Sequence, residues 1–313
     1  MQRNDATSPV EGAGRRVGGP ALALPTEVEI GFLDRPRGPD LFLRRVRPPE
    51  PLARLMLLHA SLVHSEYYVP FALRLAALGI ETWLPDLRGH GRSGGVRGYT
   101  RSWDEAVEDA AWAFDAMAKG SDLPCWAGGE SYGGLVAYSA IKAGRVQPQA
   151  CLFLSPAFGI FYRPSPVAWW VLERVGLPVF GRIRPLRALP AAGITEDPAV
   201  SRAFERDPLC NRRYTLAFLL RMMVEQRGLR IPDPDWRIPS LVLLSGGDPI
   251  TDNAVSRSVF ARSPQVQVRE AEGGLHSLVA DKPAWAAAQV ADWLGREGVQ
   301  ASWRAAGARR QEP

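Results

Sequence analysis

The sequence predicts an α/β protein with a doubly wound, mostly parallel central sheet and helices on both faces of that sheet. Short apolar segments typical of buried strands alternate along the chain with segments of helical periodicity. The 313 residues suffice for one large domain that carries an insertion. The composition, with 46% hydrophobic and 23% charged residues, is that of an ordinary globular enzyme.

The expected elements follow one another in regular order. Strands are expected at residues 26–33, 41–46, 54–58, 80–84, 125–127, 150–154, 240–244 and 265–269. Helices are expected at 68–78, 102–117, 135–141 and 283–294, and Ser102 with Glu105 predicts a capping box at the start of the second helix. The first two strands are expected to form an antiparallel hairpin. Functional residues of such sheets lie at the carboxyl ends of the parallel strands.

Residues 157–236 interrupt this alternation. Strand signals vanish there, prolines and arginines multiply, and helical runs occur at 167–175 and 214–226. The sequence therefore predicts a helical insertion between two parts of one core, residues 25–156 and 237–296. Residues 1–24 and 297–313 have little periodicity and are expected to be a disordered leader and a flexible tail.

Charge and cysteine content restrict the partners and the compartment. The formal net charge is +5, but much of the arginine excess lies in the two tails and the insertion, with no basic stripe interleaved with aromatics. This distribution argues against a nucleic-acid partner. Cys125, Cys151 and Cys210 are an odd number in widely separated contexts, which favours reduced thiols. With no apolar signal core near Met1, we expect a cytoplasmic location.

The stretch around Ser131 carries the first chemical signal. A short apolar segment enters a turn in which Gly129, Ser131 and Gly133 match the G-x-S-x-G nucleophile elbow, and a helical segment follows. Ordinary glycine-rich loops also contain this pattern. The interpretation of Ser131 as a nucleophile therefore depends on partners elsewhere in the chain.

A serine nucleophile needs a base that a carboxylate orients. Only His276 among the four histidines follows Ser131 in the chain, and it lies in a loop before the last helix. Asp248 follows the 240–244 strand through a glycine turn and is the preferred acid, while Asp252 is explained as a loop acid or helix cap. Acids of the insertion lie among prolines and are typical of turns: Asp197, Asp207, Asp233 and Asp235.

An oxyanion formed during acyl transfer also needs donors. One is expected from the backbone N–H of Tyr132, directly after the nucleophile, and the other from the loop at residues 59–65.

Five motifs carry a family resemblance. They are His59 with its loop through His64 and Ser65, the run Pro85-Asp86-Leu87-Arg88-Gly89-His90-Gly91-Arg92-Ser93, Gly129 to Gly134, Gly247-Asp248, and His276. In this order, over about residues 27 to 295, the chain resembles the α/β-hydrolase superfamily, and within it the serine aminopeptidase S33 type, which includes monoacylglycerol lipases and lysophospholipases. The resemblance implies an α/β-hydrolase fold in which the insertion forms a helical lid.

The resemblance also implies roles for single residues. Ser131 is the nucleophile, Asp248 the acid and His276 the base, and the amides of Ser61 and Tyr132 form the oxyanion hole. No metal or cofactor is implied. Framework positions, which shape loops rather than transfer protons, are His59, His64 and His90. Glu130 is expected to orient the turn through local hydrogen bonds.

Two departures from the family pattern concern the oxyanion site. The family usually has His-Gly-x-Gly where this chain has His59-Ala60-Ser61-Leu62, so the second donor is expected to be displaced. Loss of one donor costs about a hundred- to a thousandfold in turnover. Tyr132 replaces a smaller residue and is expected to narrow the acyl site.

These observations predict a serine carboxylic-ester hydrolase for small-molecule acyl esters such as monoacylglycerols or lysophospholipids. An insertion with Trp170 and Arg174 suits an acyl chain with a polar or anionic head, and suits peripheral membrane contact through the lid. Two alternatives stay open: an acyltransferase or thioesterase with the same triad, and a non-catalytic binding protein of the same fold.

Overall fold

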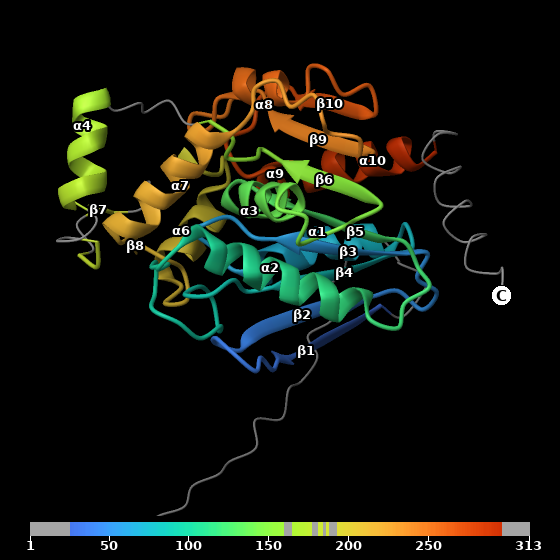
Figure 1. Cartoon of the computed structure of the whole chain (residues 1–313). Coiled ribbons are helices and arrows are strands. Elements are labelled where there is room, and N and C mark those ends of the chain that lie inside the picture. The colour runs from blue at the N-terminus through green and yellow to red at the C-terminus, as the bar shows by residue number, and fades with distance from the viewer. Residues whose placement is uncertain (1–25, 160–164, 177–180, 184–185, 188–192, 296–313) are drawn as a thin grey trace, which may run out of the picture.

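The computed structural model describes residues 26–159, 165–176, 181–183, 186–187 and 193–295. Eight strands form one sheet in the order β1-β2-β4-β3-β5-β6-β9-β10 (Figure 1). They are β1 (Glu27–Leu33), β2 (Leu41–Arg47), β3 (Ala53–Leu58), β4 (Ile80–Pro85), β5 (Cys125–Glu130), β6 (Ala150–Leu154), β9 (Ser240–Ser245) and β10 (Val266–Ala271). The pairs β1 with β2 and β2 with β4 are antiparallel, and the other pairs are parallel. The predicted mostly parallel sheet is confirmed.

Helices cover both faces of the sheet (Figure 1). They are α1 (Val69–Ala76), α2 (Trp103–Ala118), α3 (Tyr132–Lys142), α8 (Asn253–Val259), α9 (Leu278–Asp281) and α10 (Pro283–Leu294), with a 3-10 turn, η1 (Ser65–Tyr68), before α1. Because strand side chains alternate between faces, Leu55 and Leu57 pack with α1, α9 and α10, while Met56 and Leu58 pack with α2 and α3. Each such buried side chain contributes about 1.5–3 kcal/mol of transfer free energy.

The expected strands and helices of the core are all present, with small changes at their ends. The capping box at α2 is wrong in detail: Ser102 makes no side-chain cap hydrogen bond, and the Glu105 carboxylate accepts from the Arg101 N–H at 2.9 Å instead. The sequence analysis also missed η1, α8 and α9, which are short. The expected leader and tail, residues 1–24 and 297–313, lie outside the described residues.

The insertion between β6 and β9 is largely helical in its described parts. These contain α4 (Pro166–Val171), a π-helical turn η2 (Leu172–Gly176), α6 (Pro198–Arg206), α7 (Leu216–Gly228) and one short antiparallel pair, β7 (Leu186–Arg187) with β8 (Arg213–Tyr214). Residues 160–164, 177–180, 184–185 and 188–192 lie outside the described parts. The Asn211 N–H donates to the Leu62 carbonyl at 2.8 Å, and its side-chain amide donates to the Gly89 carbonyl at 3.0 Å. The insertion therefore contacts the loops that follow β3 and β4.

Among the described helices, none is long and apolar enough to cross a membrane. None of the three cysteines forms a disulfide bond, and all three are buried.

Gly128 tests how tightly the centre of the sheet is packed. A Cβ at this position would lie 1.8 Å from the Leu152 carbonyl oxygen on β6, so we expect Gly128→Ala to destabilise the protein by about 3 kcal/mol or more. Gly31, on the exposed strand β1, has no atom within 4 Å of a built Cβ, and Gly31→Ala is the matched control. Urea unfolding of both variants measures the difference. Equal stability of the two variants would contradict the described packing.

Candidate active site

Ser131 occupies a strained turn between β5 and α3. Its φ of 53° and ψ of −118° lie outside the regions that residues other than glycine favour. Such a conformation costs about 1–3 kcal/mol and persists only where neighbours fix it. Here the Ser131 N–H donates to the Leu154 carbonyl at 3.0 Å, and the Ser131 carbonyl accepts from Ala157 at 3.0 Å and Leu135 at 3.1 Å. The turn presents the serine at the carboxyl end of β5.

The two glycines of the motif are required by close backbone contacts. A Cβ on Gly133 would lie 2.3 Å from the Leu58 carbonyl oxygen, and one on Gly129 would lie 2.5 Å from the Gly133 carbonyl carbon. Real Cβ atoms do not approach other atoms this closely. The G-x-S-x-G spacing therefore lets α3 start directly against the end of β3.

Asp248 and His276 form a buried ion pair. His276 Nδ1 lies 2.8 Å from Asp248 Oδ2, and the two side chains are 5% and 0% exposed. The same carboxylate accepts from the Ile250 N–H at 2.8 Å and from the Thr251 hydroxyl at 2.5 Å. These donors fix the carboxylate toward the imidazole.

The electrostatics of this pair favour ionisation of both partners. Burial alone would raise the pKa of Asp248, but the hydrogen bond and charge of His276, together with Thr251 and Ile250, lower it below its usual value. Burial alone would lower the pKa of His276, but the hydrogen bond and charge of Asp248, with a further contribution from Glu130, raise it. An ionised Asp248 accepts, so the imidazole proton sits on Nδ1 and leaves Nε2 as the basic nitrogen.

The predicted site residues follow the carboxyl ends of the parallel strands β3, β5, β9 and β10, so they all lie at one edge of the sheet. Asp248 and His276 are in direct contact. Within the described residues, no hydrogen bond joins the Ser131 hydroxyl to His276. Long or absent catalytic hydrogen bonds are common where no substrate is bound. Asp252, the competing acid, caps α8 by accepting from Ala254 and Val255, as expected.

The loop after β3 is held from two sides. The Ala60 N–H donates to the Tyr68 hydroxyl at 2.8 Å, and the Ser61 hydroxyl accepts from the Tyr214 hydroxyl of β8 at 3.0 Å. The Tyr132 N–H is the first of α3 and has no partner inside that helix. The Tyr132 ring is buried and packs on Phe218 of α7, with ring centroids 4.9 Å apart.

Two of the expected framework histidines bind backbone groups. His59 Nε2 accepts from the Leu87 N–H at 2.9 Å, and His90 Nδ1 lies 2.9 Å from the Arg88 carbonyl. Burial lowers the pKa of His59, and it lowers the pKa of His90 to about 3, with a contribution from His59. Both rings are therefore neutral near neutral pH.

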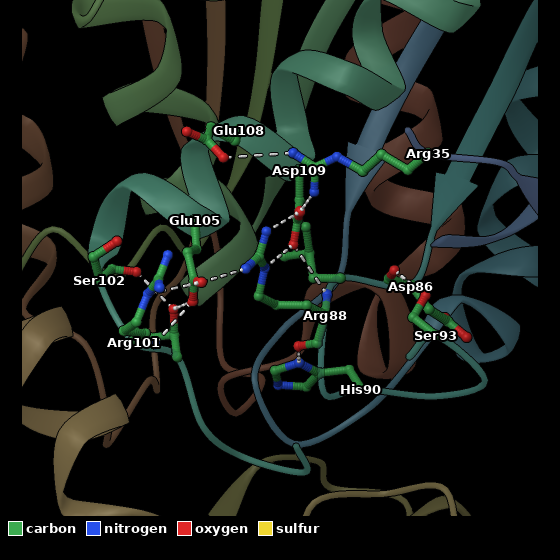
Figure 2. A network of polar contacts seen from close by, with 12 residues as sticks. Arg35, Asp86, Arg88, His90, Ser93, Arg101, Ser102, Glu105, Glu108 and Asp109 are labelled. Carbon is green, nitrogen blue, oxygen red and sulfur yellow. Dashed lines mark hydrogen bonds and ion pairs between the residues drawn. The ribbon is translucent and has the colours of Figure 1, made fainter. Parts of the chain in front are cut away.

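The run from Asp86 to Ser93 anchors loops to α2. The Asp86 carboxylate accepts from the Ser65 N–H at 2.7 Å and from the Arg92 N–H at 2.8 Å. Arg88 donates two hydrogen bonds of 2.6 Å to Asp109 of α2, and Figure 2 shows this pair at the centre of a larger polar network. This run is part of the scaffold that supports the site.

One group of potential metal ligands occurs in the part of the chain that the structure describes. Ligand atoms of His64, Asp207 and Cys210 lie within 4.8 Å of one another. Protein contacts already join them, because His64 Nε2 lies 2.8 Å from Asp207 Oδ2 and the Tyr67 hydroxyl donates to the same oxygen at 2.9 Å. Asp207 thus pairs with a residue far away in the chain, and Asp233 binds Tyr138 and Lys142 in the same way. Both acids also form the predicted turns, because Asp207 accepts from the Leu209 N–H at 2.7 Å and Asp233 accepts from the Asp235 N–H at 3.2 Å. The sequence analysis missed only their long-range partners.

Glu130 has a larger role than local sequence suggests. Its buried carboxylate accepts from the Tyr68 hydroxyl at 2.6 Å, from the Ser277 hydroxyl at 3.2 Å and from the Val279 N–H at 3.3 Å. These partners are 62 to 149 residues away in the chain. The expectation of local hydrogen bonds is therefore wrong, because every side-chain partner comes from another element.

The Asp248 and His276 pair predicts a pH-dependent coupling. Stability from the raised pKa of His276 is present below its unfolded value of 6.5 and is lost as pH rises through the folded pKa. Stability from the lowered pKa of Asp248 is present above 3.8 and is lost as pH falls through the folded pKa. We expect the coupling free energy from a double-mutant cycle of Asp248→Asn and His276→Gln to be larger at about pH 5.5 than at about pH 9. Urea unfolding measures it, and a coupling that does not change with pH contradicts the assignment.

Comparison with known proteins identifies several relatives of this chain. A monoacylglycerol lipase of Mycolicibacterium smegmatis is 31% identical over 178 residues, which cover 56% of this chain and 62% of that protein. Phospholipase YtpA of Bacillus subtilis is 25% identical over 234 residues, covering 73% of this chain and 89% of that protein. An uncharacterised abhydrolase domain-containing protein of Dictyostelium discoideum is 26% identical over 69% of this chain, which spans only 23% of that longer relative.

Solved structures show the same fold. A monoacylglycerol lipase of Paleococcus ferrophilus matches with a TM-score of 0.66 and 22% identity, over 80% of this chain and 98% of that one. A soluble variant of monoglyceride lipase from Saccharomyces cerevisiae, in complex with a substrate analogue, matches with a TM-score of 0.73 and 18% identity, over 86% of this chain and 95% of that one. The family model described as serine aminopeptidase, S33, matches residues 49–283, more than half of the chain. The chain therefore belongs to the serine aminopeptidase S33 family, a family of serine hydrolases with the α/β-hydrolase fold.

Proposed function

We propose that this protein hydrolyses acyl esters through a triad of Ser131, His276 and Asp248. The observation that carries the proposal is the buried pair of His276 and Asp248, at the same sheet edge as a serine held in a strained turn. The alternative of a non-catalytic protein does not explain why a carboxylate and an imidazole are both held in ionisable form beside that turn.

Each member of the proposed triad has one role. Asp248 accepts a hydrogen bond from the Nδ1–H of His276, which leaves Nε2 as the basic nitrogen for Ser131. His276 takes the Ser131 proton as Ser131 Oγ attacks the ester carbonyl, and it then donates that proton to the leaving alcohol. Water activated by the same nitrogen cleaves the acyl-enzyme and regenerates the serine. The raised pKa of His276 favours the imidazolium that forms in both steps.

Two backbone amides are proposed to hold the oxyanion. The Tyr132 N–H, at the start of α3, combines an unpaired donor with the positive end of the helix dipole. The second donor is the Ser61 N–H, in a loop whose neighbouring amide, that of Ala60, is already bound to Tyr68.

The proposed substrates are lipid esters with one acyl chain, such as monoacylglycerols or lysophospholipids. The monoacylglycerol lipase and the phospholipase among the relatives support this class. The loop between β10 and α9, residues 272–277, carries His276 and is called the histidine loop. A cavity of about 630 Å³ lies between α6 and this loop. Its lining is mixed in polarity and comprises Thr195, Glu196, Pro198, Ser201, Arg202 and Leu275. Leu275, the neighbour of His276, lines this cavity together with one acidic and one basic residue, and such a lining suits a polar head rather than a second acyl chain.

The insertion is proposed to act as the lid. Its Asn211 and Tyr214 contact the loop that carries the second oxyanion amide, and its helix α7 packs on Tyr132. Exposed apolar side chains on α4, Val167 and Trp170, support contact with a lipid surface through this segment.

Removal of the nucleophile tests the proposal. We expect the purified protein to hydrolyse monoacylglycerols and to react with a fluorophosphonate probe, and Ser131→Ala to lose both properties. Asp248→Asn is expected to lower kcat by about four orders of magnitude, because the wrong imidazole tautomer is then favoured. Mass spectrometry of the labelled peptide locates the adduct. A folded wild-type protein without adduct or ester cleavage would exclude the proposed function, and acyl transfer to an added alcohol would favour an acyltransferase.

If the backbone amide of Ser61 is the oxyanion donor, removal of the Ser61 hydroxyl is expected to change kcat only slightly. Because the proposed donor is the backbone amide, Ser61→Ala is expected to retain kcat within about tenfold. Tyr214→Phe removes the same hydroxyl contact from the other side and is the matched variant. Steady-state kinetics with one monoacylglycerol compares the two. A thousandfold lower kcat in Ser61→Ala alone would show that the Ser61 hydroxyl acts directly, and it would contradict the backbone amide as the oxyanion donor.

A further inference from the structure

We propose that Glu130 is a positioning residue that links the oxyanion loop to the histidine loop and stabilises the charged form of His276. This inference rests on the proposed function, and it concerns a carboxylate next to the nucleophile that the triad does not use.

The first argument is the burial of Glu130 without a permanent cation. The residue is 1% exposed, and no ion pair to arginine or lysine involves it among the described residues. A buried carboxylate normally pairs with a cation, because desolvation of an isolated charge is costly. Hydrogen bonds from Tyr68, Ser277 and Val279 take the place of a cation here. Burial raises the pKa of Glu130, and these three donors oppose that rise by stabilising the ionised carboxylate.

The second argument is the connection to the oxyanion loop. The Tyr68 hydroxyl donates to Glu130 Oε2 at 2.6 Å and accepts from the Ala60 N–H at 2.8 Å. This relay fixes the Ala60 amide, directly before the proposed donor Ser61. The loop lacks the glycines that are usual in its family, and the tyrosine bridge supplies the constraint that holds its backbone.

The third argument is the connection to His276. Ser277, the next residue, donates its hydroxyl to both Glu130 oxygens at 3.2 Å, and the Val279 N–H donates at 3.3 Å. The negative charge of Glu130 also raises the pKa of His276, in addition to the hydrogen bond and charge of Asp248. The titratable groups that face Glu130 are Tyr68 from η1 and His276 from the histidine loop. The imidazolium formed during catalysis is thus the cation that Glu130 otherwise lacks.

The experiment separates the charge of Glu130 from its bridging role. Glu130→Gln keeps the shape and removes the charge, so the acid limb of the pH profile of kcat/KM, which follows His276, is expected to move to lower pH. Tyr68→Phe keeps the carboxyl group and cuts the bridge, so kcat is expected to fall by roughly ten- to a hundredfold, with the acid limb moved less than in Glu130→Gln. A purely structural role for Glu130 would not move the acid limb.

A second buried pair provides the control. The Tyr138 hydroxyl donates to the buried Asp233 carboxylate at 2.6 Å, away from the proposed triad. Asp233→Asn and Tyr138→Phe are expected to lower the unfolding temperature but to leave the acid limb in place and kcat within about threefold. An acid limb unchanged in Glu130→Gln, or moved as far in Asp233→Asn, would overturn the inference.

A direct readout keeps the inference separate from the proposed function. NMR titration of the His276 ring in wild type and Glu130→Gln reports the same pKa difference without any turnover. A lower His276 pKa in the variant supports the inference even if no ester is cleaved, and an unchanged His276 pKa overturns it. If Glu130→Gln does not fold, Glu130→Asp is titrated instead, and the greater separation of its shorter carboxylate from the ring is expected to lower the pKa in the same direction.

Discussion

The close approach of backbone atoms around Ser131 is the constraint on which the rest of the site depends. The turn brings Gly133 against the Leu58 carbonyl and Gly128 against Leu152, at distances that no side chain fits. Only this approach lets β5 end, reverse at a residue of positive φ and start α3 within one residue. The cost of the strained serine, about 1–3 kcal/mol, is offset by hydrogen bonds to the end of β6 and the segment after it. The position of the serine is thus set by the sheet rather than by a loop.

Burial and neighbouring carboxylates together determine which histidines at this edge of the sheet carry a charge. His59 and His90 are kept neutral, because they are buried against backbone groups without a sufficient anion. His276 is equally buried but faces two carboxylates, and its pKa is raised instead. These three buried histidines therefore differ in the direction of their pKa shifts. The pKa is raised only at His276, which faces the carboxylates of Asp248 and Glu130. The arrangement favours a positive charge at one imidazole, the one that the proposed mechanism needs.

Much of the fold was predictable from the sequence because its strands are short apolar segments bounded by glycine, proline and polar residues. The sheet strands and the core helices, including α10 to the residue, follow from periodicity. The motif around Ser131, the glycine turn before Asp248 and the position of His276 also predicted which residues gather at one edge. Short helices such as α8 and α9 were missed, because one or two turns do not establish a helical period.

The residues that escaped prediction act over long sequence separations. Glu130 was interpreted from its neighbours in the chain, whereas its partners lie in other elements. Asp207 and Asp233 form the predicted turns, but their bonds to His64 and Tyr138 were not predicted. A single sequence carries no signal for such pairing. The capping box failed for a related reason: the Glu105 side chain has several donors in reach, and residue spacing does not state which of them it selects.

The contacts of the insertion with the loop after β3 have a consequence for the timing of the proposed reaction. Tyr214 holds the Ser61 hydroxyl and Asn211 holds the Leu62 carbonyl, so the segment that would open for a lipid also grips the residues around the second amide. Movement of the insertion would therefore also move the residues proposed to stabilise the transition state. On the proposed assignment of the insertion as the lid, a lipid surface that displaces the insertion would also displace the loop of the second amide, and so would change the turnover rate without contacting any reacting atom.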